Sequence, residues 1–83
     1  MAYGEEFTNS GIIERYIIED GKTIINLEGN SVMAFTVDGE LYFLDKIRVR
    51  ITYEDKRLPS GNYPVKVLEL FKGRKTKEIY RND

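Results

Sequence analysis

The side chains that could do chemistry in this chain are mostly basic and aromatic, and the second half of the sequence holds most of the basic ones. The chain has 13 Lys and Arg residues, and eleven of them lie between residues 46 and 83. Basic side chains bind phosphate oxygens, and aromatic rings stack on nucleotide bases. Nucleic-acid binding is therefore the first chemistry to examine.

Catalysis and metal binding have little support in the sequence. The chain has no Cys and no His, which excludes thiolate nucleophiles, Cys/His metal sites and Ser/His arrangements. Paired carboxylates, as in glycosidases, are the remaining option. The acidic pairs are Glu5-Glu6, Glu19-Asp20 and Glu54-Asp55, and each stands among polar or turn-forming residues, as solvated charge clusters do. The sequence predicts a protein that is not an enzyme and that uses no cofactor and no metal ion.

Charge is divided unevenly along the chain, although the net charge is only −1. Residues 1–45 carry Arg15 and Lys22 against nine acids, a net of −7, whereas residues 46–83 carry eleven basic residues against five acids, a net of +6. Such asymmetry points to a polyanion-binding face. The alternative is that acidic and basic strands pair with each other, each cross-strand pair contributing about 0.2–1 kcal/mol. Both interpretations stay open at this point.

A single-strand binder needs a positive groove for phosphates and aromatic platforms for bases. Arg48 and Arg50 alternate with apolar residues in IRVRITYE (residues 47–54), so they share the solvent face of a predicted strand. For any single tyrosine, a half-buried strand residue with a solvated hydroxyl is the competing interpretation. The candidate contacts are Arg48, Arg50, Lys66, Lys72, Arg74, Lys75 and Lys77, with Tyr42 and Tyr80 as stacking platforms and Tyr16 as a weaker one.

Strand patterns dominate the middle of the chain. In IRVRITYE the residues Ile47, Val49, Ile51 and Tyr53 fall on one face, which predicts a core-facing side. SVMAFTV (31–37) and ELYFLDK (40–46) are rich in strand-forming residues, and Asp38-Gly39 between them is typical of a type I′ turn. We therefore expect these two segments to form a tight hairpin, with a bend near Asp45-Lys46 before the next strand.

The two ends of the chain fit the same class. VKVLELFK (65–72) changes its apolar face midway, which predicts either a bulge or a strand covered on both sides. The highly charged KTKEIYR (75–81) suits the edge of a sheet. In SGIIERYIIEDG (10–21) the apolar spacing also allows a helix. Its four Ile residues and the turn dipeptide Asp20-Gly21 favour strand, turn and strand instead.

About six short strands in 83 residues predict a single domain, residues 1–83, with an all-β fold. We expect a small five- to six-stranded antiparallel barrel that is OB-like, with an SH3-like barrel or a small sandwich as alternatives. No apolar run approaches the roughly 20 residues of a membrane span, and MAYGEEFTNS lacks the pattern of a signal peptide. The expected location is cytoplasmic, without membrane contact.

The segment LPSGNYPVKV (58–67) combines turn and strand signals. Pro59 and Gly61 predict a type I turn, and Pro64 predicts a strand start at a rim of the sheet. With IRVRITYE before it, the pattern L-P-x-G-x-Y-x-V resembles the C-terminal half of filamentous-phage single-stranded DNA-binding proteins of the gene V type. The resemblance covers roughly residues 41–80, and the matching residues are Leu58, Pro59, Gly61, Tyr63 and Val65.

This resemblance implies an OB-like five-stranded barrel, a viral or mobile-element origin and cooperative binding to single-stranded DNA. It also implies a homodimer with the matched loop near the two-fold axis. In that family the DNA contacts lie largely on a long basic hairpin in the N-terminal half, whereas residues 9–30 here contain only Arg15 and Lys22 as basic residues. Either DNA binding uses another face in this chain, or the fold serves another purpose.

Two functions follow from these observations. The first is a non-catalytic module that binds single-stranded DNA or RNA through a basic strand face with aromatic stacking. The alternative is a small protein-interaction module, such as a viral or plasmid inhibitor or an assembly protein, that acts through an edge strand or an acidic face.

Overall fold

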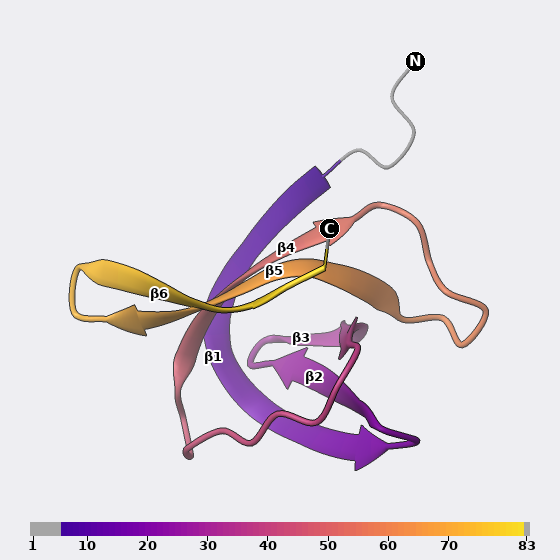
Figure 1. Ribbon diagram of the computed structural model, residues 1–83, viewed down its shortest axis with the longest axis horizontal. Helices are drawn as coiled ribbons and strands as arrows, with labels where there is room; N and C mark the ends of the chain where they lie inside the picture. Colours follow the sequence, from indigo (N-terminus) through magenta and orange to yellow (C-terminus); the bar gives the residue numbers. More distant parts are fainter. Residues whose placement is uncertain (1–5, 83) are drawn as a thin grey trace.

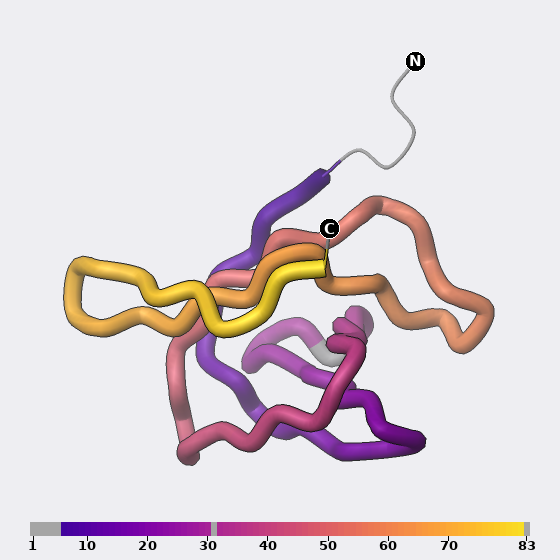
Figure 2. The backbone as a smooth tube through the Cα atoms, in the orientation of Figure 1, coloured from indigo at the N-terminus to yellow at the C-terminus, as the bar shows by residue number. Residues whose placement is uncertain are grey.

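The computed structural model describes residues 6–82, which form one six-stranded sheet (Figures 1 and 2). Glu5 of the first acidic pair and the ends of the expected domain 1–83 lie outside the described residues. No helix within residues 6–82 has the length and apolar character that crossing a membrane requires. The strands are β1 (Glu6–Glu19), β2 (Lys22–Leu27), β3 (Asn30–Val37), β4 (Arg48–Glu54), β5 (Tyr63–Lys72) and β6 (Lys75–Arg81).

The long strand β1 joins the two halves of the sheet. Its first part, Glu6 to Ile12, pairs with β4, and its second part pairs with β2. A bulge between Ile13 and Arg15 lies at the start of the second part, and a bulge bends the strand that carries it. Figure 1 shows the resulting curve, which carries β1 from one side of the molecule to the other.

The sheet closes on itself through a short parallel contact. Strands β2 and β3 pair antiparallel, as do β4 and β5, and β3 meets β5 in parallel at Phe35 opposite Tyr63 and Thr36 opposite Pro64. The ring β1-β2-β3-β5-β4 is a small OB-like barrel, which confirms the expected fold class. The parallel contact is the one departure from a purely antiparallel pattern among the described strands.

The interior of the ring is filled by alternate residues of the strands. As predicted, Val49, Ile51 and Tyr53 of β4 are buried, and Ile47, just before β4, is partly buried against them. The ring centroids of Phe35 and Tyr53 are 5.0 Å apart. The buried apolar residues are Ile13, Ile25, Leu27, Phe35, Val37, Val49, Ile51, Tyr53, Val65 and Leu68.

Several turns have the predicted form. Asp20 and Gly21 both have positive φ, 51° and 73°, as a type I′ turn requires, so residues 10–21 form strand and turn rather than helix. The Gly61 N–H donates a 2.8 Å hydrogen bond to the Leu58 carbonyl and closes the LPSG turn. Pro64 lies at the start of β5, where a strand tolerates a missing N–H.

The expected tight hairpin of residues 31–37 and 40–46 is wrong. Strand β3 ends at Val37, and residues 38–47, which we call the strap, form no strand (Figure 1). The hydroxyl of the buried Thr23 accepts a 2.8 Å hydrogen bond from Leu41 N–H and donates a 2.7 Å bond to the Gly39 carbonyl. A side chain of β2 therefore holds two backbone groups at the start of the strap.

Buried and exposed side chains alternate along the strap although the strap is not paired in a sheet. Leu41 and Phe43 pack against the core, whereas Tyr42 and Leu44 are 73% and 80% exposed. An extended segment lying on a core shows the same period of two as a strand. The predicted bend at Asp45-Lys46 is confirmed, and Lys46 has a φ of 57° there.

The C-terminal hairpin also has the predicted features. The register of β4 against β5 shifts by one residue opposite Lys66, which is the predicted bulge. Strand β6 pairs with β5 alone among the described strands, so it forms an edge of the sheet. In Figure 1 the β5–β6 turn projects from one end of the molecule, opposite the end that holds the β1–β2 turn.

Candidate nucleic-acid interface

The seven predicted cations fall into two groups, and the first group is neutralised by acids. Arg50 stands opposite Glu69 across the sheet, with its Nε 3.8 Å from a carboxylate oxygen. Lys66, at the bulge of β5, has its Nζ 3.4 Å from Glu54 and 3.9 Å from Glu6. On this outer face the pairing of acidic and basic strands, rather than a free positive surface, accounts for the charges.

The second group lies at the far end of the β5–β6 hairpin. All five of its side chains are exposed, and within residues 6–82 none of them forms an ion pair. We call it the hairpin basic cluster; it consists of Arg48, Lys72, Arg74, Lys75 and Lys77.

The register of the hairpin concentrates these charges. Lys72 stands directly opposite Lys75, and Lys77 stands opposite Leu70 on the same face. Like charges in directly opposed positions destabilise a sheet by a fraction of a kcal/mol, up to about 1 kcal/mol. The sequence of the hairpin is therefore not optimised for the stability of the hairpin.

Arg48 lies on the other face of the sheet. Val49 is opposite Leu70 and points to the core, so Arg48 and Phe71 point outward, and the Arg48 guanidinium carbon is 5.9 Å from the centre of the Phe71 ring. A cation over an aromatic face is held by the ring quadrupole. Arg48 and Arg50 share the outer face of β4, as the sequence predicts. With the lysines of β5 and β6, the cations of the cluster lie on both faces of the hairpin.

The two main aromatic candidates differ in exposure. Tyr42 projects from the strap into solvent, and its hydroxyl donates a 3.2 Å hydrogen bond to a Glu40 carboxylate oxygen. The negative charge of Glu40 raises the pKa of Tyr42 above its ordinary value. Tyr80 is half-buried against the core, and its hydroxyl accepts a 3.2 Å bond from Asp38 N–H. The Tyr42 ring is therefore open to solvent, whereas Tyr80 mainly supports the fold.

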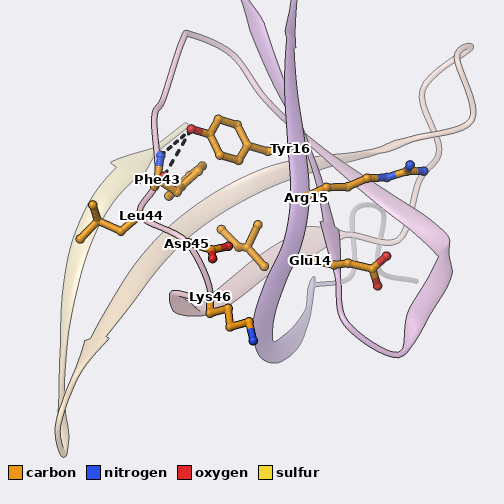
Figure 3. A pocket seen from close by; sticks show the side chains of 8 residues that line it. Glu14, Arg15, Tyr16, Phe43, Leu44, Asp45 and Lys46 are labelled. Carbon is orange, nitrogen blue, oxygen red and sulfur yellow. Dashed lines mark hydrogen bonds between the residues drawn. The ribbon is translucent and has the colours of Figure 1, made fainter.

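Tyr16 lines a cavity of about 290 Å³ between β1 and the strap (Figure 3). Its hydroxyl accepts a 3.0 Å hydrogen bond from Phe43 N–H and lies 3.3 Å from the Phe43 carbonyl, to which it donates. The two rings meet edge to face with centroids 5.0 Å apart. Tyr16 therefore fixes the strap that carries Tyr42 and offers no free hydroxyl of its own.

The residues that carry the family resemblance serve the turn and the core. Val65 is buried, and Tyr63 packs against the core with its ring centroid 5.4 Å from that of Tyr53. Arg57 donates a 3.1 Å hydrogen bond from Nε to the Tyr63 hydroxyl, and this bond raises the pKa of Arg57. The turn itself contains Leu58, Pro59 and Gly61.

Sequence reasoning missed two residues that contact the predicted cations. Phe71 lies under Arg48, and Glu69 forms an ion pair with Arg50, but only the strand register places either of them beside its partner. Within residues 6–82 no group of three or more His, Cys, Asp or Glu side chains is arranged to hold a metal ion.

Comparison with protein-family models, with curated proteins and with solved structures finds no match to this chain.

Proposed function

We propose that this chain is a non-catalytic module that binds single-stranded DNA or RNA through the hairpin basic cluster. The observation that supports it most is the separation of the cations. Arg50 and Lys66 are neutralised by carboxylates, whereas the five cluster residues are exposed and form no ion pair within residues 6–82. A polyanion would relieve the repulsion between Lys72 and Lys75, because its phosphates would lie between the two ammonium groups.

The shape of the cluster favours a single strand over a duplex. Its cations lie on both faces of a projecting hairpin, so a nucleic acid must bend around the hairpin to meet them all. A single strand bends freely, whereas duplex DNA is stiff over about 150 base pairs. The exposed ring of Tyr42 could then stack on a base, an interaction worth about 1–3 kcal/mol.

The decisive experiment compares two double variants with the same change in net charge. Lys72→Gln with Lys75→Gln removes the two opposed ammonium groups of the cluster, and Lys22→Gln with Lys56→Gln removes two exposed cations elsewhere. Binding of a labelled single-stranded oligonucleotide and of its duplex is followed by fluorescence anisotropy at low and moderate salt. We expect the wild type to prefer the single strand and to bind more weakly as salt rises.

The cluster variant should bind more weakly and with a shallower salt dependence, because fewer phosphates are neutralised. The logarithmic slope should fall by about 0.7 for each phosphate that the variant no longer binds. The control should retain the wild-type slope. Equal weakening in both variants would show that only net charge matters and would remove the assignment to the hairpin.

A protein-interaction module is the second candidate, and the free edge of β6 favours it. Strand β6 pairs with β5 alone among the strands of residues 6–82, so an extended segment of a partner could add to the sheet there. Absence of oligonucleotide binding at low salt, where exposed cations should register, would favour this candidate over the first.

A further inference from the structure

Two adjoining cavities lie on the outer side of β2 and β3, at the end of the molecule away from the hairpin basic cluster. Their volumes are about 250 Å³ and 160 Å³, and Lys22, Thr36 and Leu58 line both of them. We call them together the β2–β3 cleft. The β1–β2 turn and the β4–β5 loop border the cleft, and Figure 1 shows both on the same side of the barrel.

The cleft contains a buried polar atom without a partner. Phe35 and Val37 point into the core, so Thr36 between them points outward, and it lines both cavities. The Thr36 Oγ1 atom is buried and forms no hydrogen bond within residues 6–82. Leaving such a group unsatisfied costs free energy, and most buried polar groups have a partner. The Thr36 hydroxyl would gain this bond if a docked group displaced the atoms that cover it.

The charged groups of the cleft indicate the sign of the ligand. Glu19, Asp20 and Asp38 contribute three carboxylates, and Lys22 is the cation among the lining residues. OB-like barrels commonly bind oligonucleotides on this face, between these two loops. In this chain the carboxylates would repel phosphates there, so the usual nucleic-acid face carries the wrong charge for that ligand.

We propose that the β2–β3 cleft docks a Lys or Arg side chain from an extended, basic segment of a partner protein. Ammonium and guanidinium groups only donate hydrogen bonds, which suits carboxylates and an unpartnered hydroxyl oxygen. The methylene stem of the same side chain would lie on the apolar surface of Leu58 and Ile24. This second site goes beyond nucleic-acid binding and is independent of the hairpin basic cluster.

The test uses two dye-labelled peptides that differ only in charge. In one peptide Arg alternates with Leu, and in the other Glu replaces every Arg. The variant Glu19→Gln with Asp20→Asn removes two carboxylates, and Asn tolerates the positive φ of the turn. Its control, Glu14→Gln with Glu28→Gln, makes the same charge change at two exposed residues that do not line the cleft.

We expect the wild type to bind the Arg peptide and not the Glu peptide, with about tenfold weaker binding in the cleft variant and little change in the control. The variant Thr36→Val should affect peptide binding and fold stability differently. It should weaken peptide binding while leaving the fold as stable or more stable, because the variant removes an unsatisfied hydroxyl. The variant Lys72→Gln with Lys75→Gln should bind the peptide like the wild type, which separates this proposal from the proposed function.

Three outcomes would overturn the proposal. The first is equal weakening in the control variant. The second is displacement of the peptide by an oligonucleotide whose binding also depends on Glu19 and Asp20, which would make the cleft a nucleic-acid site. The third is concentration-dependent self-association that Glu19→Gln with Asp20→Asn abolishes, which would make a second copy of the chain the occupant.

Discussion

Single hydroxyl groups decide how the strap lies on the barrel. Thr23 is the one buried polar side chain among the described residues, and both of its hydrogen bonds go to backbone groups of the strap. Tyr16 makes the corresponding bonds to Phe43. These interactions hold in place a segment that exposes Tyr42 and Leu44, so the candidate stacking residue depends on two side chains distant in sequence.

Replacing Thr23 with Val should destabilise the protein. The change keeps the branched shape but leaves Gly39 C=O and Leu41 N–H without their partner, at a cost of about 1–3 kcal/mol. Urea unfolding followed by circular dichroism measures the change. Thr8→Val, at an exposed site on β1, is the matched control and should change stability by less than about 0.5 kcal/mol. A destabilisation at Thr23 no larger than that at Thr8 would refute this role.

Tyr53 should make the protein sensitive to alkaline pH. Burial, with smaller contributions from Tyr63 and Asp55, raises the pKa of Tyr53 above its ordinary value. Because the folded state disfavours the ionised form, the stabilisation is present below the unfolded pKa of about 10 and is lost as pH rises through the folded value.

The variant Tyr53→Phe should therefore lose less stability than the wild type between neutral pH and pH values above about 10. Ultraviolet titration of tyrosinate should also show that the variant lacks one late-titrating group. Identical pH profiles for the two proteins would contradict this assignment.

At the scale of elements, the strands follow the alternation of the sequence, whereas their partners follow from the geometry of the barrel. Strand β4 lies within the segment that the alternation of apolar and polar residues predicts. Its Arg50, however, is neutralised by Glu69 of β5. In the β5–β6 hairpin the charges are not neutralised, because Lys72 and Lys75 stand opposite each other and destabilise the pairing of the two strands. Elements that depart from local optimisation are expected where function imposes another demand.

Lys75→Glu should change stability and binding in opposite directions. An opposite-charge pair with Lys72 should stabilise the hairpin by about 0.2–1 kcal/mol relative to the present like-charge pair. The same change should weaken oligonucleotide binding. Thermal unfolding and anisotropy on one sample series measure both effects, with Lys56→Glu in the β4–β5 loop as the control. Tighter binding by the Lys75 variant would contradict the role of the cluster.

At the scale of the molecule, charge is divided between the two ends of a barrel with a long dimension of 36 Å. The hairpin basic cluster lies at one end, and the acidic β1–β2 turn lies at the other. The two ends are separated by more than the Debye length, which is about 8 Å at physiological salt. Their charges are therefore screened from each other and do not neutralise each other. The two proposed binding sites therefore lie at opposite ends of the barrel.

The family resemblance also predicts a homodimer. Sedimentation equilibrium should give a mass of about twice the 9.7 kDa chain at high protein concentration. Leu58→Asp, in the matched loop, should shift this mass toward the monomer if the loop lies near the two-fold axis. A constant monomer mass across the concentration range would contradict the dimer.

The sequence by itself determined the strand class, the β1–β2 and LPSG turns and the charged edge strand, whereas it left the bulge in β5 as one of two alternatives. These features depend on local patterns, such as the alternation in IRVRITYE and the positive φ that Asp20-Gly21 adopts readily. Local patterns also made the strap look like a strand, because Leu41 and Phe43 alternate with Tyr42 and Leu44 in either arrangement.

Only the tertiary structure decided which cations are neutralised. Arg48 and Arg50 are equivalent in the sequence, yet one lies over Phe71 and the other faces Glu69, because the register of β4 against β5 fixes their neighbours. The unpartnered hydroxyl of Thr36 is likewise invisible in the sequence. Its burial arises where β3 meets β5, and that pairing joins residues that lie far apart in the chain.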